Sequence, residues 1–130
     1  MGVSASRRVM VVDDDPVVLE VTRERLASAG YAVSVRSSAF GTSAAIIRER
    51  PDIVLLDVSM PGIAGNVLAD LVRERTEHPV SIILYSSGDR ANLEDLARRC
   101  GACGVIQKTP SAASFFAQLD SCLARTPAAK

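Results

Sequence analysis

The residues best suited to chemistry in this sequence are five polar side chains, each of which follows a short apolar segment. Three are carboxylates, one is a hydroxyl and one is an amine: Asp13, Asp14, Asp57, Ser86 and Lys108. Carboxylates held close together repel one another and require a counter-charge. Their hard oxygen atoms suit Mg²⁺, which takes one or two carboxylates together with waters and a phosphate. We therefore expect a magnesium site if these residues meet in the fold.

The same five residues match the needs of phosphoryl transfer. That reaction depends mostly on positioning and charge compensation, and an Asp carboxylate can be the nucleophile that forms an aspartyl phosphate. The ammonium of Lys108 suits a phosphoryl or carboxylate oxygen, and the hydroxyl of Ser86 can bond a phosphoryl oxygen. Taken alone, Asp57 would more often be a turn residue at the end of a strand. The whole set predicts a site that binds Mg²⁺ and receives a phosphoryl group.

Five short segments are expected to form the strands that position these side chains. Ile53–Leu56 is too short for a helix and is typical of a strand buried on both faces, bounded by Pro51 and by Met60-Pro61-Gly62. The predicted strands are about residues 7–13, 31–36, 53–56, 80–85 and 104–107.

Segments between the strands are expected to form helices. Asp15 is suited to cap the first helix, with Pro16 at its first helical position. Ser37-Ser38 can cap the second, in which Gly41 is an unfavourable interior residue. The predicted helices are about residues 16–29, 39–49, 66–76, 90–99 and 111–124.

Strands and helices therefore alternate five times along the chain. This alternation predicts an α/β fold, in which a parallel sheet carries helices on both faces through right-handed crossovers. Ligands of such sheets bind outside the carboxyl ends of the strands. The five polar residues all follow strands, so we expect them to gather at this one edge.

Composition narrows the possible functions. The 130 residues suit a single domain over 1–130, with a core at about 7–124 and short flexible tails. The 15 basic and 15 acidic residues balance, which argues against a nucleic-acid surface or a membrane-surface helix. No apolar run is long enough for a membrane span, and residues 1–8 are not a signal peptide. Three cysteines, an odd number, favour a cytoplasmic location.

Taken in order, these motifs resemble the receiver domain of bacterial two-component response regulators. The resemblance is carried by Val11-Val12-Asp13-Asp14-Asp15, by Asp57 with Met60-Pro61-Gly62, by Ser86 and by Lys108. It implies a flavodoxin-like (βα)5 three-layer sandwich with strand order 2-1-3-4-5, which is known for that fold and is not deduced from the spacing. It also implies a phospho-accepting signalling domain that promotes its own phosphorylation and dephosphorylation, and not an enzyme in the ordinary sense.

The resemblance assigns roles to the matched positions. Asp57 is implied to be the phospho-acceptor, with Lys108 paired to the phosphoryl group. Mg²⁺ is implied to be held by Asp13, Asp14 and Asp57, and by the backbone carbonyl of Ser59. The implied donor is a sensor histidine kinase or a histidine phosphotransfer protein.

The signal is implied to leave the site through Ser86, whose hydroxyl would move toward the phosphoryl group. We expect the surface of the fourth helix, fifth strand and fifth helix to change, mainly through residues 86–92. That surface would bind a downstream protein or another copy of the chain. A stand-alone regulator and a receiver belonging to a longer protein both remain possible.

Two positions depart from the family pattern. Val105 stands where the family usually has an aromatic ring that rotates when the Ser or Thr moves, and Tyr85 is expected to pack in the core. The family usually has Lys-Pro, often with a cis bond, whereas here Thr109 separates Lys108 from Pro110. We expect either a cis Lys108–Thr109 bond or a rearranged loop.

Two other protein classes share parts of this residue pattern. Asp13-x-Asp15, with Ser86 and Lys108, also fits a haloacid-dehalogenase-type phosphatase, but after Lys108 only Asp120 offers a further carboxylate. Three aspartates in the loop after the first strand would repel the phosphate of a flavodoxin cofactor.

A redox site and a module that binds partners without phosphorylation complete the alternatives. Cys100-Gly101-Ala102-Cys103 has the spacing of a thiol redox site, yet it follows a helix, whose negative dipole end disfavours a thiolate. The departures at Val105 and Thr109 favour the non-phosphorylated module, and the acidic residues argue against it.

Overall fold

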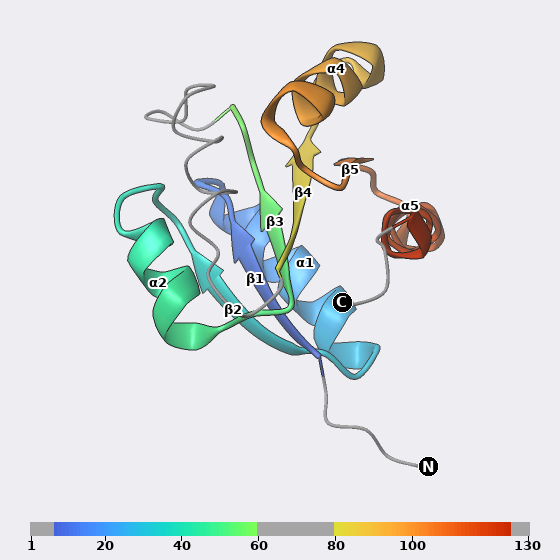
Figure 1. Cartoon of the computed structure of the whole chain (residues 1–130). Helices are drawn as coiled ribbons and strands as arrows, with labels where there is room; N and C mark the ends of the chain where they lie inside the picture. The colour runs from blue at the N-terminus through green and yellow to red at the C-terminus, as the bar shows by residue number, and fades with distance from the viewer. Residues whose placement is uncertain (1–6, 60–79, 126–130) are drawn as a thin grey trace.

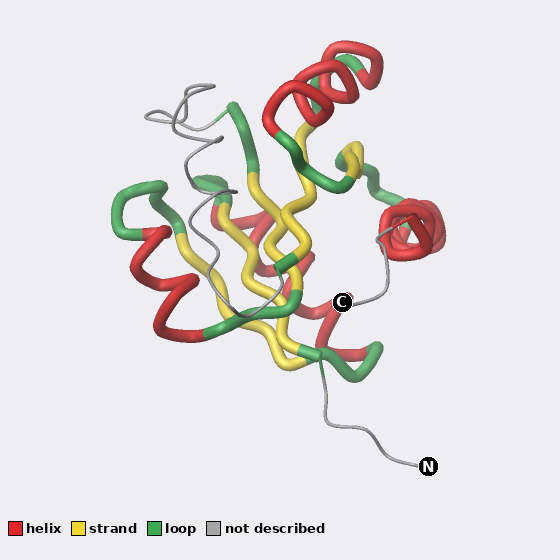
Figure 2. The backbone as a smooth tube through the Cα atoms, in the orientation of Figure 1, coloured by secondary structure: helices red, strands yellow, loops and turns green. Residues whose placement is uncertain are grey.

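The structure is a computed structural model that describes residues 7–59 and 80–125 (Figures 1 and 2). Its strands are β1 (Arg8–Val12), β2 (Ala32–Arg36), β3 (Ile53–Leu56), β4 (Ser81–Ser86) and β5 (Gly104–Gln107). Its helices are α1 (Pro16–Ser28), α2 (Thr42–Glu49), α4 (Arg90–Cys100) and α5 (Ala112–Arg125). The helix predicted at 66–76 and most of the loop that precedes it lie outside the described residues. No helix in the described ranges is long and apolar enough to cross a membrane.

The five strands form one parallel sheet in the order β2-β1-β3-β4-β5, which confirms the expected α/β fold. Two strands that are far apart in the sequence, β1 and β3, are neighbours at its centre. The strand order reverses at this point: β2 lies on one side of β1, and β3 lies on the other side, followed by β4 and β5. A crevice at such a switch point is where open sheets bind ligands.

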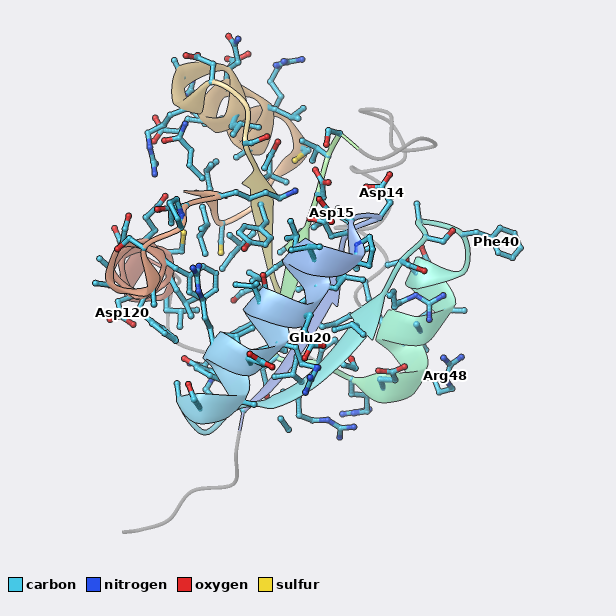
Figure 3. The ribbon with its side chains drawn as sticks, turned by 180° about the vertical axis from the view of Figure 1, so that it is seen from behind. Asp14, Asp15, Glu20, Phe40, Arg48 and Asp120 are labelled. Atoms are coloured by element: carbon cyan, nitrogen blue, oxygen red, sulfur yellow. The ribbon has the colours of Figure 1, made fainter. Side chains whose placement is uncertain are left out.

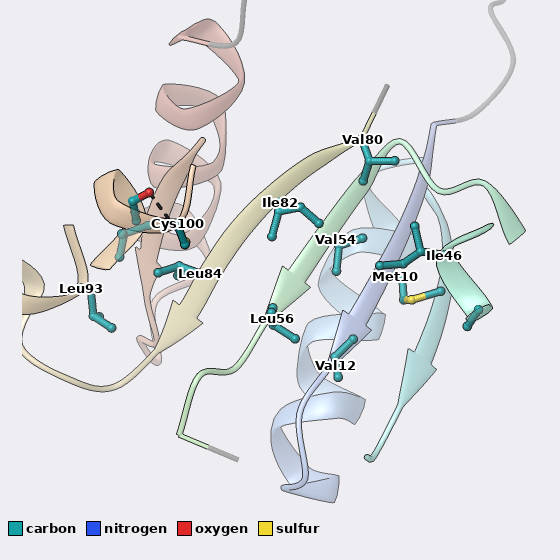
Figure 4. Close-up of a cluster of buried hydrophobic side chains, with 13 residues drawn as sticks. Met10, Val12, Ile46, Val54, Leu56, Val80, Ile82, Leu84, Leu93 and Cys100 are labelled. Carbon is teal, nitrogen blue, oxygen red and sulfur yellow. Dashed lines mark hydrogen bonds between the residues drawn. The ribbon is translucent and has the colours of Figure 1, made fainter. Parts of the chain in front are cut away.

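Alternate residues of each strand face opposite sides of the sheet, and both sides are apolar and covered. Val9 and Val11 face α1 and α5, whereas Met10 and Val12 face α2 and α4. Figure 4 shows the α2–α4 side, on which strand residues pack against Ile46 and other helix residues. Burial on both faces explains why the central strands β1 and β3 carry unbroken apolar runs, as buried parallel strands usually do.

Local capping sets where the helices begin. The Asp15 side chain accepts a hydrogen bond from Val17 N, so the predicted cap of α1 is confirmed. The predicted start of α2 at residue 39 with a Ser37-Ser38 cap is wrong. Gly41 is the N-cap residue and has φ of 79°, a left-handed conformation that favours glycine and that ends the preceding turn. The helix therefore begins at Thr42.

The hydrogen bond that caps α4 can be tested by substitution. Asp89 accepts a hydrogen bond from Asn92 N at 3.1 Å, so Asp89→Ala should lower the free energy of unfolding by about 1 kcal/mol. The matched control is Asp120→Ala, because Asp120 is exposed on α5 (Figure 3) and should change stability by less than about 0.5 kcal/mol. Urea denaturation of both variants measures the difference, and equal midpoints would contradict the cap.

Candidate functional site

The sequence-predicted site residues lie at the carboxyl edge of the sheet. Asp13 and Asp57 directly follow β1 and β3, Ser86 ends β4, and Lys108 directly follows β5. The last residues of β1 and β3 are paired in register, so the two carboxylates leave the sheet side by side. Asp14 lies at the same edge (Figure 3). The topology therefore brings together residues that are up to 95 positions apart in the sequence.

Asp57 is held on both of its carboxylate oxygens and is 1% exposed. Its backbone N donates to Val12 O at 2.9 Å, which continues the β1–β3 ladder past the end of β3. Oδ1 accepts hydrogen bonds from Ser59 N at 2.9 Å and from Ser59 Oγ at 2.7 Å. Oδ2 accepts from Lys108 Nζ at 3.2 Å. These contacts fix the orientation of the carboxylate.

The other two carboxylates differ in their exposure to solvent. Asp13 is 0% exposed, and its Oδ1 accepts a hydrogen bond from Asp15 N at 2.9 Å. Its Oδ2 lies 2.6 Å from Lys108 Nζ, which makes this the shorter of the two ion pairs of Lys108. Asp14 is exposed and faces the solvent side of the pocket. One oxygen from each of Asp13, Asp14 and Asp57 lies within 4.8 Å of the others.

The electrostatics of this pocket favour the protonated form of two of its groups. Burial, assisted by the nearby charge of Asp57, raises the pKa of Asp13 even though Lys108 and the Asp15 amide oppose the shift. Burial alone would lower the pKa of Lys108, but the carboxylates of Asp13 and Asp57 outweigh it and raise that pKa. The main causes differ: burial dominates for Asp13, whereas for Lys108 the hydrogen bond and charges of its two carboxylate partners dominate. In formal charge, three carboxylates and one ammonium leave two excess negative charges at the site.

The residues present fit a hard divalent cation such as Mg²⁺. All three candidate ligands supply carboxylate oxygens, and the excess of negative charge equals the charge of such an ion. Asp13 Oδ2 is buried and, within the described ranges, accepts no hydrogen bond of good geometry, although Lys108 Nζ is close. A buried oxygen in that condition has capacity left for a metal ion. The predicted acidic metal site is therefore consistent with the geometry.

Ser86 lies at the same edge without touching the carboxylates. It is 4% exposed, and its Oγ accepts a hydrogen bond from Gly88 N at 3.3 Å. Among the described residues, its Oγ has no hydrogen bond to Asp57 or Lys108. Ser59 contacts Asp57 through its amide and hydroxyl, and residue 60 lies outside the described ranges. The pocket therefore unites Asp13, Asp14, Asp57 and Lys108, with Ser86 beside it.

The two departures from the family pattern have clear structural consequences. Val105 is buried on the α2–α4 side of the sheet, whereas Tyr85 is buried on the α1–α5 side. The Tyr85 hydroxyl shares a hydrogen bond of 2.8 Å with Thr22 Oγ1, and its ring meets Phe115 edge-on at 5.9 Å. The expected packing of Tyr85 is confirmed. Because the two residues occupy opposite faces, the Tyr85 ring does not replace the ring that is absent at position 105.

The loop after Lys108 depends on a residue that the sequence analysis did not select. The Lys108–Thr109 bond is trans, so the alternative with a cis bond is wrong. Arg25 of α1 donates to Thr109 O and to Pro110 O, each at 3.1 Å. A helical position three residues after Thr22 places Arg25 on the same side of α1. Its partners are 84 and 85 residues away, and no local pattern identifies them.

The two cysteines of the CxxC segment do not form a redox pair. Cys100 packs on the α2–α4 side with its Sγ toward Ala97 O, whereas Cys103 packs against the core on the α1–α5 side. Cys100 and Cys103 are both free thiols. The geometry gives the redox alternative no support.

Comparisons with known proteins agree with the fold and the acidic pocket. Residues 9–120 match the model of the response regulator receiver domain. The chain is 32% identical over 117 residues to the transcriptional regulatory protein CseB of Streptomyces coelicolor, covering 90% of this chain and 49% of that protein. It is 31% identical over 111 residues to the transcriptional regulatory protein RstA of Escherichia coli K12, covering 85% of this chain and 46% of that protein. The chain thus spans about half the length of these curated relatives.

Solved structures show the same fold. The chemotaxis response regulator CheY4 of Vibrio cholerae superposes with a TM-score of 0.77 at 18% identity, covering 90% of this chain and 98% of that one. The N-terminal domain of the nisin resistance regulator NsrR, a lantibiotic response regulator, superposes with a TM-score of 0.73 at 27% identity, covering 90% of this chain and 97% of that one. The family match, the strand order and the acidic triad lead to one conclusion: the chain belongs to the response regulator receiver domain family.

Proposed function

We propose that this domain accepts a phosphoryl group on Asp57 from a histidine kinase or histidine phosphotransfer protein and relays the signal to another protein. The main support for this proposal is the geometry of Asp57. Hydrogen bonds from Ser59 and Lys108 orient its carboxylate, and two further carboxylates lie beside it. The proposed location is the cytoplasm, in line with the free thiols of Cys100 and Cys103.

Different residues of the chain form the new bond, balance charge and hold the metal ion in this reaction. An oxygen of Asp57 forms the new bond to phosphorus while the bond from phosphorus to the donor nitrogen breaks, and the donor keeps that electron pair. Lys108 neutralises the reacting carboxylate and then balances the phosphoryl oxygens. Asp13, Asp14, Asp57 and the Ser59 carbonyl would hold Mg²⁺, which when bound offsets negative charge on the phosphoryl group.

The second candidate is a receiver-like module that binds partners without phosphorylation. It is favoured by Val105, which supplies no ring for the usual switch, and by the displaced proline after Lys108. The acidic pocket favours phosphorylation, since an interaction module has no need of a buried excess of charge. A phosphatase that uses Asp13 is less favoured, because the one carboxylate that follows Lys108 in the sequence, Asp120, is exposed on α5.

The identity of the acceptor can be tested directly. Incubation with acetyl phosphate and Mg²⁺ should add one phosphoryl group, and peptide mapping should place it on Asp57. Asp57→Asn should add none, because the amide is not a nucleophile for this reaction. Intact mass spectrometry is the measurement. A phosphoryl group on Asp13 would favour the phosphatase, and no uptake from acetyl phosphate or a kinase would favour the non-phosphorylated module.

Binding of Mg²⁺ should stabilise the native protein, because the three carboxylates meet only in the folded state. The melting temperature should rise with millimolar Mg²⁺, and Asp14→Asn should reduce that rise. Asp120→Asn is the matched control, since it removes an exposed carboxylate on α5 and should leave the rise intact. A wild-type melting temperature that does not respond to Mg²⁺ would count against the metal site.

Hydrogen bonds supply a route from the site to the outer strand β5 and to α5. Ser86 contacts Gly88, whose carbonyl accepts from Gln107 Nε2 at 2.9 Å. Gln118 of α5 accepts from Gln107 N at 2.8 Å and donates to Gln107 O at 3.2 Å. Arg90, at the start of α4, also bonds Gln118. Movement of Ser86 toward a phosphoryl group would therefore disturb contacts with β5 and α5, and we propose that α4, β5 and α5 form the partner surface.

Hydrogen exchange with and without beryllofluoride, a phosphoryl mimic, tests this route. Exchange should change at residues 86–92 and at Gln107, because their bonds depend on the position of Ser86. In Ser86→Ala the mimic should still bind at Asp57, but the change at 86–92 should be lost. A change limited to residues near Asp57 in the wild type would contradict the route.

A further inference from the structure

We infer that Arg25 is a positioning residue, which holds the loop after β5 so that Lys108 reaches the acidic pocket. This role rests on the proposed phosphorylation of Asp57. Arg25 Nη1 donates to Thr109 O and Nη2 to Pro110 O, both at 3.1 Å. The two acceptors are successive carbonyls, and the first belongs to the residue directly after Lys108. A planar guanidinium can make both bonds at once.

Lys108 requires such support because its own side chain is flexible. Its Nζ must stay within reach of both Asp13 and Asp57, at 2.6 and 3.2 Å, from a four-carbon stem. Its backbone N is tied to Ser86 O at 2.9 Å, which fixes the residue on one side. Arg25 fixes the chain on the other side. Release of Thr109 and Pro110 would remove the backbone tie on that side.

The surroundings of Arg25 hold the guanidinium in place. It lies over the Phe115 ring, 5.5 Å from its centroid, a cation–π arrangement. One turn earlier in α1, Thr22 bonds the buried Tyr85 hydroxyl at 2.8 Å. Lys108 Nζ in turn lies 5.6 Å from the centroid of the Tyr85 ring. The α1 helix therefore contacts β4 through Thr22 and the loop through Arg25, with Lys108 between the two contacts.

The experiment measures the rate of phosphorylation by acetyl phosphate in two backgrounds. In the protein that keeps Lys108, Arg25→Ala should slow phosphorylation by roughly 10- to 100-fold. This is the order expected when a charged group is misplaced by about 1 Å. In the Lys108→Ala background it should change nothing further, because it acts through Lys108. Arg25→Lys should not restore the rate, since one ammonium does not reproduce the two-pronged contact.

Arg23→Ala is the matched control. Arg23 is on the same helix and, among the described residues, pairs with the exposed Glu20. Its removal should leave the rate unchanged. If Arg25→Ala and Lys108→Ala instead slow the reaction by independent factors that multiply, Arg25 does not act through Lys108 and the inference is overturned.

Hydrogen exchange of the unphosphorylated protein gives a readout that does not depend on the reaction. The amides of Lys108, Thr109 and Ser111 should exchange faster in Arg25→Ala than in Arg23→Ala, while amides of β3 stay protected in both. Unchanged exchange at these amides would overturn the inference. If the wild-type chain accepts no phosphoryl group, the proposed function fails and the role of Arg25 fails with it. This outcome differs from one in which the wild type is phosphorylated but Arg25→Ala and Lys108→Ala slow the reaction independently, which overturns only the inference about Arg25.

Discussion

A buried excess of negative charge at the carboxyl edge of the sheet governs the arrangement of this domain. Asp13 and Asp57 lie almost completely out of water, where an ionised carboxylate without a partner is strongly disfavoured. One ammonium, that of Lys108, serves both of them. The Asp15 amide donates a hydrogen bond to Asp13 Oδ1, and the amide and hydroxyl of Ser59 donate to Asp57 Oδ1. The remaining imbalance suits a divalent cation and an incoming group whose charge must be compensated.

The parallel sheet makes this concentration of charge possible. Its central strands β1 and β3 are buried on both faces and are held by two apolar clusters, so their ends have little freedom to separate. The polar groups at the edge also connect to two different sides of the molecule. Lys108 is linked toward α1 through Tyr85 and Arg25, and Ser86 is linked toward α5 through Gly88 and Gln107.

The second of these connections bears on how a receiver without a ring at position 105 could respond. Val105 is small and packed, so no large side chain has to move when Ser86 moves. The Gln118 amide instead bonds both the N–H and the carbonyl of Gln107 on β5. Hydrogen bonds weaken steeply with distance and angle, so a small displacement of the loop is enough to change them. The proposed signal is therefore carried by polar contacts and a modest change in packing.

Local patterns in the sequence were sufficient for the sheet, the α1 cap and the list of pocket residues, because strand ends, caps and apolar periodicity depend on near neighbours. The strand order came from the resemblance to the family and not from the spacing. The predicted start of α2 is wrong, since Gly41 is the N-cap residue in a left-handed conformation and not an interior residue of the helix. Only the tertiary structure showed that Lys108 lies closer to Asp13 than to Asp57, that the CxxC cysteines face opposite sides, and that Arg25 holds the loop. These features are contacts between residues far apart in the chain, which packing decides and local sequence does not record.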